Sequence, residues 1–598
     1  MSYKTPGVYV EEKSLFPPSV AQVETAIPAF IGFTEMAEDE EGNTLHETPT
    51  RIESMLEYET YFGGPQPQAF EVNLAEEAPY LPQSLSFQGG KTPYLMHPAL
   101  EMFYANGGGP CYIVSVGDYD DATEVSSLDS IEDYQELKDG LDKIRKVDEV
   151  TLIVLPEASQ LSADSQYDLY KDVLMQCGDL QDRFGIFDVR SEDDDGSDFR
   201  NGIGTSFLRY GAAYYPHLNT SVSYAYTPEA VTFKHASGPF DDFVWNEVQI
   251  LAEALNLQQQ LEDAKTRVDG ADTDAQAEPI ESIRKDEFVA LLGIAKRNAD
   301  KAISFAEDAL ELIADETFTS SDLDAAKTEY ADSESIDDSN TKEEIRDAIG
   351  AFQGATEDAQ TAMEAIITEL NDPNQTSIPE SSNSDIEDHY TNEFQSELTK
   401  LLDEERMTMP PSSTMAGIYA KVDEDRGVWK SPANVSINRV SGPAEKLTIS
   451  ENDSFNVHPT GKSINVIRAF TGKGTLVWGA RTLDGNSNEW RYISVRRFFN
   501  MVEESVKKAT EPFVFEPNDA NTWVKVKAMI ENFLTVQWRS GALMGAKPED
   551  AFYVKVGLGE TMTQQNVLEG EMIVEIGMAV VRPAEFIILR FSHKMLES

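Results

Sequence analysis

Between Pro93 and His217, segments with a helix-like pattern of apolar positions alternate with segments that have a strand-like pattern. Segments with helical periodicity are followed by short β-branched runs, as in "LKDGLDKIRKVDEV" followed by "TLIVLP". Such an alternation is typical of helices and buried strands that take turns along the chain. It predicts an α/β sandwich with a largely parallel sheet, and the apolar segment "IPAFIGFTE" before it predicts a further strand.

A different pattern occupies residues 221–409. The segment is acidic and rich in Ala, and its apolar positions repeat on one helical face, as Phe288, Leu292, Ala295 and Ala299 do. A stripe at this spacing is more often the core of a helix bundle than a surface for a partner. We therefore expect a helical domain inserted into the α/β domain.

Beyond Met409 the α/β pattern resumes with "PPSSTMAGIYAKV", and a β-rich stretch is expected over residues 435–457. The final part of the chain predicts two helices, in "SVRRFFNMVEESVKKA" and "NTWVKVKAMIENFLTVQWRSGAL". Three strands are expected after them, in "AFYVKVGL", "EMIVEIGMAVV" and "EFIILRFS". An α+β domain thus ends the chain.

A short strand without a partner is predicted near each end of the chain. Val8, Tyr9 and Val10 alternate after a Pro-Gly turn, and Pro17-Pro18 prevents a hairpin. The strand that contains Phe586, Ile588 and Arg590 lies almost at the C-terminus. A lone strand exposes unpaired N–H and C=O groups along both edges. This raises the question of what these two strands pair with.

Charge limits the choice of partner. The 598 residues carry a formal net charge of −58, which makes free nucleic acid and anionic membranes poor partners. No apolar run is long enough to cross a bilayer, no secretory signal is expected, and two cysteines suit a reducing cytoplasm. Residues 461–598 hold 17 Lys and Arg against 16 Asp and Glu, so the acidity lies in the part before them.

Residue types that carry chemistry do not gather into a catalytic pattern. The seven histidines stand singly and neither cysteine belongs to a CxxC motif, so zinc has no predicted site. The motif "TGKS" (460–463) has Asn456 where a phosphate-binding loop has its first glycine. The glycines at 107–109 follow a helix and precede a strand, the order of a helix stop. Acidic loops such as "EDDDGSD" lack the ligand spacing of a calcium loop. We predict no catalytic, cofactor or metal site and no enzyme.

Several motifs together resemble contractile tail sheath proteins, which form the sheaths of contractile phage tails and of phage-tail-like extracellular injection systems. At the front these are "TPGVYVEE", "AIPAFIGFTE" and "FYANGGGPCYIVSV", and in the middle "PPSSTMAGIYAKVDEDRGVWKSPAN". The C-terminal domain carries "WGARTL", "WRYISVRR", "FEPND", "NTW", "GAL" and "RPAEFIIL" in the family's order. The helical segment 221–409 is not part of the common sheath core.

The resemblance implies an architecture: an α/β multidomain fold with an α+β sheath domain at its C-terminal end and two extended arms. The arms would add strands to a small sheet in neighbouring subunits, which answers the question about the two lone strands. The expected parts are an N-terminal arm (1–25), an outer α/β domain (26–220), the inserted helical domain (221–409), a return segment of the outer domain (410–460), a C-terminal inner sheath domain (461–584) and a C-terminal arm (585–598).

The resemblance also implies a mechanical function without cofactors. Subunits would polymerise around an inner tail tube, alone or with sheath paralogues, and contract to drive the tube through a membrane. Baseplate and tail terminator or cap proteins would be partners, with no direct nucleic acid contact and no membrane insertion. Assembly is expected in the cytoplasm, as part of a virion or an injection particle. Two rival classes stay open: a non-contractile acidic surface-array or filament protein, and an enzyme with an α/β core.

A basic cluster stands out in the C-terminal domain of this acidic chain. It consists of Arg491, Arg496, Arg497, Lys507 and Lys508, most of them on one predicted helix. One interpretation is that part of this helix faces an acidic surface of the tail tube. The alternative is intramolecular pairing, for example with Glu503 and Glu504 on the same helix.

Overall fold

The computed structural model describes most of the chain, in two compact units. The described residues are 20–39, 41–75, 81–119, 128, 131–227, 230–234, 243–277, 279, 284–311, 320–333, 335–370 and 392–589. The first unit comprises Met1–Gln66, Thr92–Val222 and Arg406–Ser598, and the second comprises Pro67–Lys91 and Ser223–Glu405. Val8, Tyr9, Val10 and Arg590, which were predicted to lie in the arms, fall outside the described residues.

An eight-stranded sheet forms the centre of the first unit. Its order is β15 (Gly474–Val477), β14 (Ile464–Phe470), β8 (Gly211–Tyr215), β7 (Phe184–Asp188), β6 (Leu152–Val154), β1 (Pro28–Thr34), β5 (Cys111–Asp118) and β2 (Thr50–Ile52). The pairs from β14 to β5 are all parallel, and only the outermost strands β15 and β2 are antiparallel to their neighbours. The prediction of an α/β body with a largely parallel sheet is confirmed.

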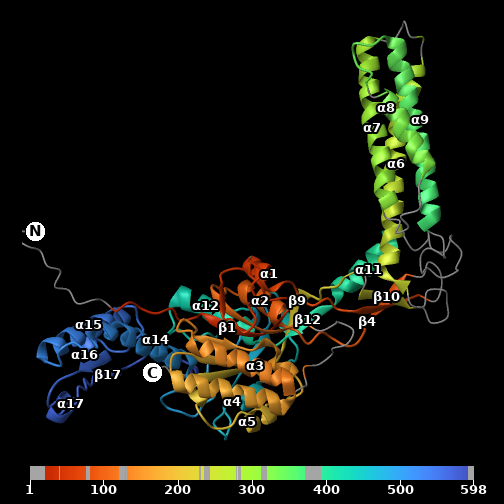
Figure 1. Ribbon diagram of the computed structural model, residues 1–598. Coiled ribbons are helices and arrows are strands. Elements are labelled where there is room, and N and C mark those ends of the chain that lie inside the picture. Colours follow the sequence, from red (N-terminus) through yellow and green to blue (C-terminus); the bar gives the residue numbers. More distant parts are fainter. Residues whose placement is uncertain are drawn as a thin grey trace, which may run out of the picture. The chain divides into compact units, whose positions relative to one another are not determined.

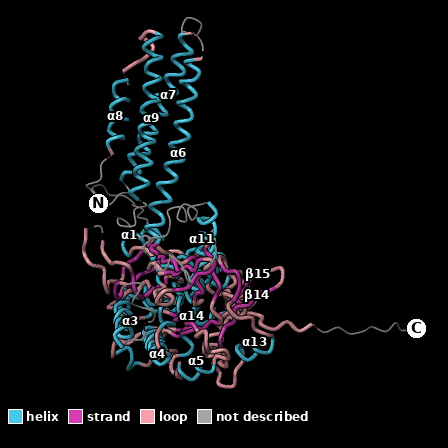
Figure 2. The backbone as a smooth tube through the Cα atoms, turned by 90° about the vertical axis from the view of Figure 1, so that its right-hand side faces the viewer, coloured by secondary structure: helices cyan, strands magenta, loops and turns pink. Residues whose placement is uncertain are grey.

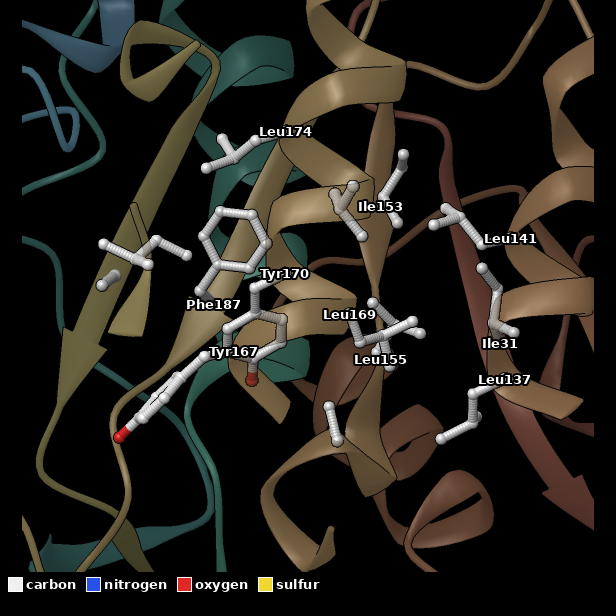
Figure 3. Packing of buried hydrophobic residues seen from close by; sticks show 14 of the residues in the cluster. Ile31, Leu137, Leu141, Ile153, Leu155, Tyr167, Leu169, Tyr170, Leu174 and Phe187 are labelled. Atoms are coloured by element: carbon white, nitrogen blue, oxygen red, sulfur yellow. The ribbon is translucent and has the colours of Figure 1, made fainter. Parts of the chain in front are cut away.

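Helices cover both faces of this sheet, which explains its apolar strands. One face packs against α3 (Ile131–Lys143), α4 (Ala163–Leu180) and α5 (Ser197–Gly202). The other packs against α1 (Met55–Phe62), α2 (Met96–Ala105) and α12 (Ser412–Arg426). Figure 3 shows the first of these cores, where Phe187 of β7 lies against Tyr170 of α4 with ring centroids 4.6 Å apart. Strands covered on both sides need apolar side chains on both sides, so β6 and β7 are buried along their whole length.

The turn between α2 and β5 contains the three glycines. Gly107 has φ +99°, in the left-handed region that favours glycine, and it stands two residues after the end of α2. The order is helix, turn, strand, as predicted, so these glycines end a helix. A phosphate site at a helix N-terminus would need the reverse order.

A smaller sheet combines strands that precede and follow α12 in the sequence, and a further helix comes after it. The sheet has the order β12 (Arg406–Met409), β9 (Leu218–Ser223) and β13 (Val440–Pro443), and it is followed by helix α13 (Ile449–Asn456). The expectation of β structure up to residue 457 is therefore wrong in its second half. Thr448 and Glu451 form a capping box that starts α13, and this local signal outweighs the β-branched residues around it.

The C-terminal domain contains the predicted helices and two of the predicted strands. Its strands form an antiparallel pair, β16 (Phe552–Lys555) and β17 (Glu575–Met578). Its helices are α14 (Ile493–Thr510), α15 (Ala520–Arg539), α16 (Pro548–Ala551) and α17 (Gln564–Leu568). Its core includes Phe498 and Val502 of α14 and Ile530 and Phe533 of α15. The first unit thus ends in an α+β domain.

The second unit combines a helix bundle with a four-stranded sheet. The helices are α6 (Trp245–Gln276), α7 (Lys285–Glu311), α8 (Ser321–Ser333), α9 (Lys342–Leu370) and α11 (Asn392–Glu404). In both views α6, α7 and α9 run side by side (Figures 1 and 2). The sheet has the order β11 (Phe243–Val244), β10 (Val231–Lys234), β3 (Phe70–Leu74) and β4 (Pro82–Phe87).

Residues 67–91 join the second unit although they lie far from it in the sequence. The sequence predicts that these residues belong to the outer α/β domain and that the insertion begins at residue 221. In the structure β3 pairs with β10 in parallel, and Phe70 contacts Tyr224 and Phe87. A two-stranded hairpin is marginal by itself, so β3 and β4 gain stability from strands that follow 140 or more residues later.

Candidate assembly interface

The described residues present no cluster of three or more His, Cys, Asp or Glu side chains that could hold a metal ion. In the motif "TGKS", Lys462 donates a hydrogen bond to the carbonyl of Arg200 and Ser463 donates one to the carbonyl of Asn456. Both side chains therefore bind backbone carbonyls within the first unit. Within the same described ranges, no helix is long and apolar enough to cross a membrane.

The chain leaves its C-terminal domain as an exposed apolar segment. Phe586, Ile587, Ile588 and Leu589 are 67%, 80%, 77% and 72% exposed, and Figure 2 shows this stretch as a loop that leads away from the body. Over residues 581–589 the structure contains no strand. Four consecutive large apolar side chains in water are unusual for a surface segment, and such patches mark interaction sites. That this segment becomes a strand between subunits stays a prediction.

Strands β16 and β17 offer edges to such a segment. Among the described residues each pairs in a ladder only with the other, so the outer edge of each strand carries free backbone groups. An apolar groove of about 400 Å³ runs between β17, α14 and α15. It is lined by Phe499, Val502, Val506, Ile530, Met572, Val574, Ile576 and Met578, with Glu503, Lys507 and Thr510 along it.

The structure buries two members of the predicted basic cluster. Arg496 donates to Glu503 at 2.7 Å and to Asn500 at 2.7 Å, and its guanidinium lies 4.3 Å from the centroid of the Trp490 ring. Its side chain is 3% exposed, and burial lowers the pKa of Arg496. Arg497 is equally buried and forms a bidentate pair with Asp423, with N–O distances of 2.6 and 3.0 Å. Neither guanidinium is accessible to an outside partner in the single chain.

The other cations of the cluster lie nearer to solvent. Lys507 and Lys508 both pair with Glu504, at 3.1 and 3.5 Å, and the Lys507 side chain is 64% exposed. The hydrogen bond that Lys507 donates to the Glu504 carboxylate raises the pKa of Lys507. Arg491 is half-buried and donates to Asn488. The intramolecular alternative thus describes most of the cluster, and a contact with a tube stays a prediction for Arg491, Lys507 and Lys508.

The sequence does not reveal two arginine–carboxylate pairs that hold the ends of the described chain, one partly buried and one buried. Arg481 binds Glu585 next to the exposed apolar segment, and Arg497 binds Asp423 beside Thr25. The first pair lies inside the motifs "WGARTL" and "RPAEFIIL". One available signal was a charged residue amid apolar neighbours in each motif. The partner cannot be identified from this signal, because 104 residues separate Arg481 from Glu585.

Comparison with protein families finds one match in this part of the chain. Residues 486–594 match the model of the phage tail sheath C-terminal domain. The chain is 24% identical over 184 residues to the tail sheath protein of Vibrio phage KVP40, which covers 31% of this chain and 26% of that protein. It is 26% identical over 114 residues to the tail sheath protein of Enterobacteria phage T4, 19% of this chain and 17% of that one. The matched segments thus span about a quarter of these relatives or less.

Solved structures resemble the chain over nearly its full length. The sheath of the PVC extracellular contractile injection system in its contracted state has a TM-score of 0.52 at 23% identity, covering 99% of each chain. The contracted helical sheath of the anti-feeding prophage gives 0.52 at 24% identity, covering 99% of this chain and 100% of that one. At these identities the likeness shows a shared fold. Together with the matched C-terminal domain, it confirms the resemblance of this chain to contractile tail sheath proteins.

Proposed function

We propose that this protein is the structural subunit of a contractile tail sheath. It polymerises helically around an inner tube and contracts to drive the tube through a target membrane. The observation that carries the proposal is the exposed apolar run from Phe586 to Leu589 at the end of a sheath-like fold. Leaving this run in water is unfavourable, because each buried large apolar side chain contributes about 1.5–3 kcal/mol. Burial of the run against a neighbouring subunit therefore stabilises the contact between the two subunits.

The acceptor in the neighbouring subunit is the pair β16 and β17. An added strand forms main-chain hydrogen bonds with an open edge and places alternate side chains against apolar surface, which is β-augmentation. The groove between β17, α14 and α15 supplies such a surface. Head-to-tail contacts repeated with a screw rotation do not close into a ring, so they produce a helical tube.

The partners follow from this role. They are further copies of the chain, alone or with sheath paralogues, an inner tail tube protein, and baseplate and terminator or cap proteins. A similar chain was solved in the baseplate of the anti-feeding prophage, which supports a place next to a baseplate. Assembly takes place in the cytoplasm, and the product is part of a phage virion or of an injection particle.

Electron microscopy of the purified chain tests the proposal. The wild type is expected to form hollow striated tubes. Removal of residues 586–598 should abolish tubes and leave the melting temperature of the monomer unchanged, because the described part of the segment, residues 586–589, pairs with no strand of its own chain. Ile588→Asp should act in the same direction. Leu568→Asp is the matched control, since Leu568 is also 77% exposed but lies on α17.

Each outcome has a clear meaning. Loss of tubes in the Ile588 variant but not in the Leu568 variant supports assembly through the C-terminal segment. Normal tubes from the truncated chain would show that this segment is not a connector. Flat sheets or thin fibres from the wild type would point to the surface-array or filament class.

We further propose that the second unit is not needed for the lattice. The chain leaves and re-enters the first unit at adjacent points: Thr92 donates to Gln66 at 2.5 Å, and Thr220 donates to the carbonyl of Met407 at 2.7 Å. Short Gly/Ser linkers from Gln66 to Thr92 and from Val222 to Arg406 should therefore preserve the first unit and its tubes. A variant that folds but forms no tubes would assign lattice contacts to the second unit.

A further inference from the structure

The C-terminal segment is held at one residue before it becomes exposed. The carboxylate of Glu585 accepts hydrogen bonds from Arg481 at 2.9 Å (Nε) and 2.7 Å (Nη2), from Asn456 at 2.7 Å and from Tyr492 at 3.2 Å. The residues next to Glu585 pack little against the rest of the first unit, since Arg582 and Ala584 are exposed and the exposed run begins at Phe586. Glu585 is thus the last firm contact of the described chain.

Arg481 is itself fixed to the central sheet. Its backbone N–H donates to the side-chain oxygen of Asn465 at 2.7 Å, and its carbonyl accepts from the Asn465 amide at 2.8 Å. Asn465 lies on β14 and also donates to the carbonyl of Ala213 on β8, at 3.2 Å. A continuous path of hydrogen bonds therefore leads from Glu585 to the centre of the parallel sheet.

The charge of Glu585 is stabilised in this setting. Burial opposes ionisation, but the hydrogen bonds from Arg481 and Asn456 and the nearby guanidinium hold the pKa of Glu585 below its usual range. Bidentate pairs between arginine and carboxylate combine strength with a fixed orientation. The pair therefore sets the direction in which the chain leaves the domain.

The N-terminal end of the described chain has an equivalent contact. The Thr25 hydroxyl donates to Asp423 at 2.6 Å, and Arg497 donates to the carbonyl of Thr25 at 2.7 Å while it pairs with Asp423. Val23 adds a backbone hydrogen bond to Ser505 at 3.1 Å. Both ends thus meet an arginine–carboxylate pair, one partly buried near β14 and the other buried between α12 and α14.

We propose that these two arginine–carboxylate pairs anchor the arms of the sheath subunit and pass the load on each arm into its body. The proposal rests on the function proposed above. Force along a connecting strand has to reach the folded body at some residue, and a fixed residue also sets how much chain is free. Without the Glu585 contact the free arm would begin after Val581, whose N–H is bonded to Ala542. The four residues 582–585 would then lengthen the reach of the arm by up to about 14 Å.

A spin label tests the anchor in the monomer. Cys111 and Cys177 are both buried, so a nitroxide on Ala584→Cys labels an exposed position selectively. Glu585→Gln should increase the mobile fraction of this label about tenfold, the equilibrium equivalent of one hydrogen bond to a charged group. Glu560→Gln is the matched control, because Glu560 is an exposed carboxylate of the same domain. Tyr492→Phe removes only the longest of the contacts and should give a smaller increase in mobility.

Electron microscopy of the same variants tests the load. Glu585→Gln tubes should be shorter and less ordered than wild-type tubes at equal protein concentration, and Glu560→Gln tubes should be normal. An unchanged label in both the Glu585 and the Tyr492 variants would overturn the anchor. A mobile label with tubes of wild-type length and order would overturn its role in carrying load. If the wild type forms no tubes, the proposed sheath function fails while the label still reports on the anchor.

Discussion

The two units of this chain build their cores from different side chains. The core around the sheet of the first unit contains large residues such as Phe103, Tyr170 and Phe187, all fully or almost fully buried. The bundle of the second unit buries many alanines, among them Ala295, Ala299, Ala302, Ala306, Ala355, Ala359 and Ala362. Alanine loses no side-chain entropy on folding and lets helices approach closely. The sheet core therefore depends on buried apolar area, and the bundle depends more on helix propensity and close fit.

The units also differ in the charges that they bury. The first unit encloses Glu157, Asp188 and the Arg497–Asp423 pair, whereas among the described residues of the bundle the buried polar ones are uncharged, such as Asn298 and Thr356. Buried charges need partners and respond to pH. The first unit is thus expected to be sensitive both to loss of volume and to pH, and the bundle to added volume.

Removal of a large ring from the sheet core should have the largest effect. Phe187→Ala is expected to lower the unfolding free energy of the first unit by about 3–5 kcal/mol, through lost burial and a residual cavity. Hydrogen exchange measured on peptides of each unit separates the two contributions. Protection should fall in β6, β7 and α4 and stay constant in α7 and α9. A parallel fall in the bundle would show that the units unfold together.

The next effect is the pH dependence that Glu157 gives to the first unit. Glu157 is fully buried: its Oε1 accepts from the N–H of Leu95 at 2.9 Å, and its Oε2 has no hydrogen-bond partner. Burial raises the pKa of Glu157 to about 8. The folded state therefore binds a proton that the unfolded state has released above about pH 4.5.

Stability should consequently fall as the pH rises from about 4.5 to about 8. Glu157→Gln is expected to flatten this part of the profile, in denaturant titrations at a series of pH values. Asp164→Asn, an exposed change on α4, serves as the control. An unaltered slope in the Gln variant would mean that Glu157 is ionised in the folded protein.

Added volume should break the bundle more than an equal change on its surface. Ala326 is 0% exposed on α8, and its neighbour Ala325 is exposed. Ala326→Leu is expected to cost about 1–3 kcal/mol through overpacking, whereas Ala325→Leu should be close to neutral. Chemical denaturation followed by exchange in α8 and α9 checks the pair. Equal effects would show that the bundle has room to adjust.

The smallest effect should come from an exposed ion pair of the bundle. Lys327 of α8 lies 2.7 Å from Glu307 of α7, and both side chains are more than 40% exposed. Lys327→Ala is expected to lower the unfolding free energy of the bundle by about 0.2–1 kcal/mol, with the lower value at high salt.

The buried pair of the first unit gives the contrast. Asp423→Ala should lower the unfolding free energy of the first unit by about 3–5 kcal/mol, because it leaves a buried guanidinium without its partner. Similar costs for the two changes would contradict the difference in buried charge.

Elements with local signals can be predicted from this sequence without its structure. The alternation of helical and β-branched segments gave the parallel sheet, the apolar stripe through Phe288 and Leu292 gave the bundle, and α14 and α15 lie where they were predicted. The motifs at both ends and in the middle gave the resemblance to sheath proteins. Periodicity and motifs need only neighbouring residues, so one sequence suffices for them.

Tertiary structure alone decided which distant residues meet. It pairs β3, in residues 67–91, with β10. It buries Arg496 and Arg497, although the sequence of their helix predicts a basic surface. It also joins Arg481 to Glu585, 104 positions further along the chain. Whether a side chain is buried or paired depends on the residues from other parts of the chain that pack against it. The periodicity of a single segment carries no such information, because its partners are supplied by chain folding over long separations.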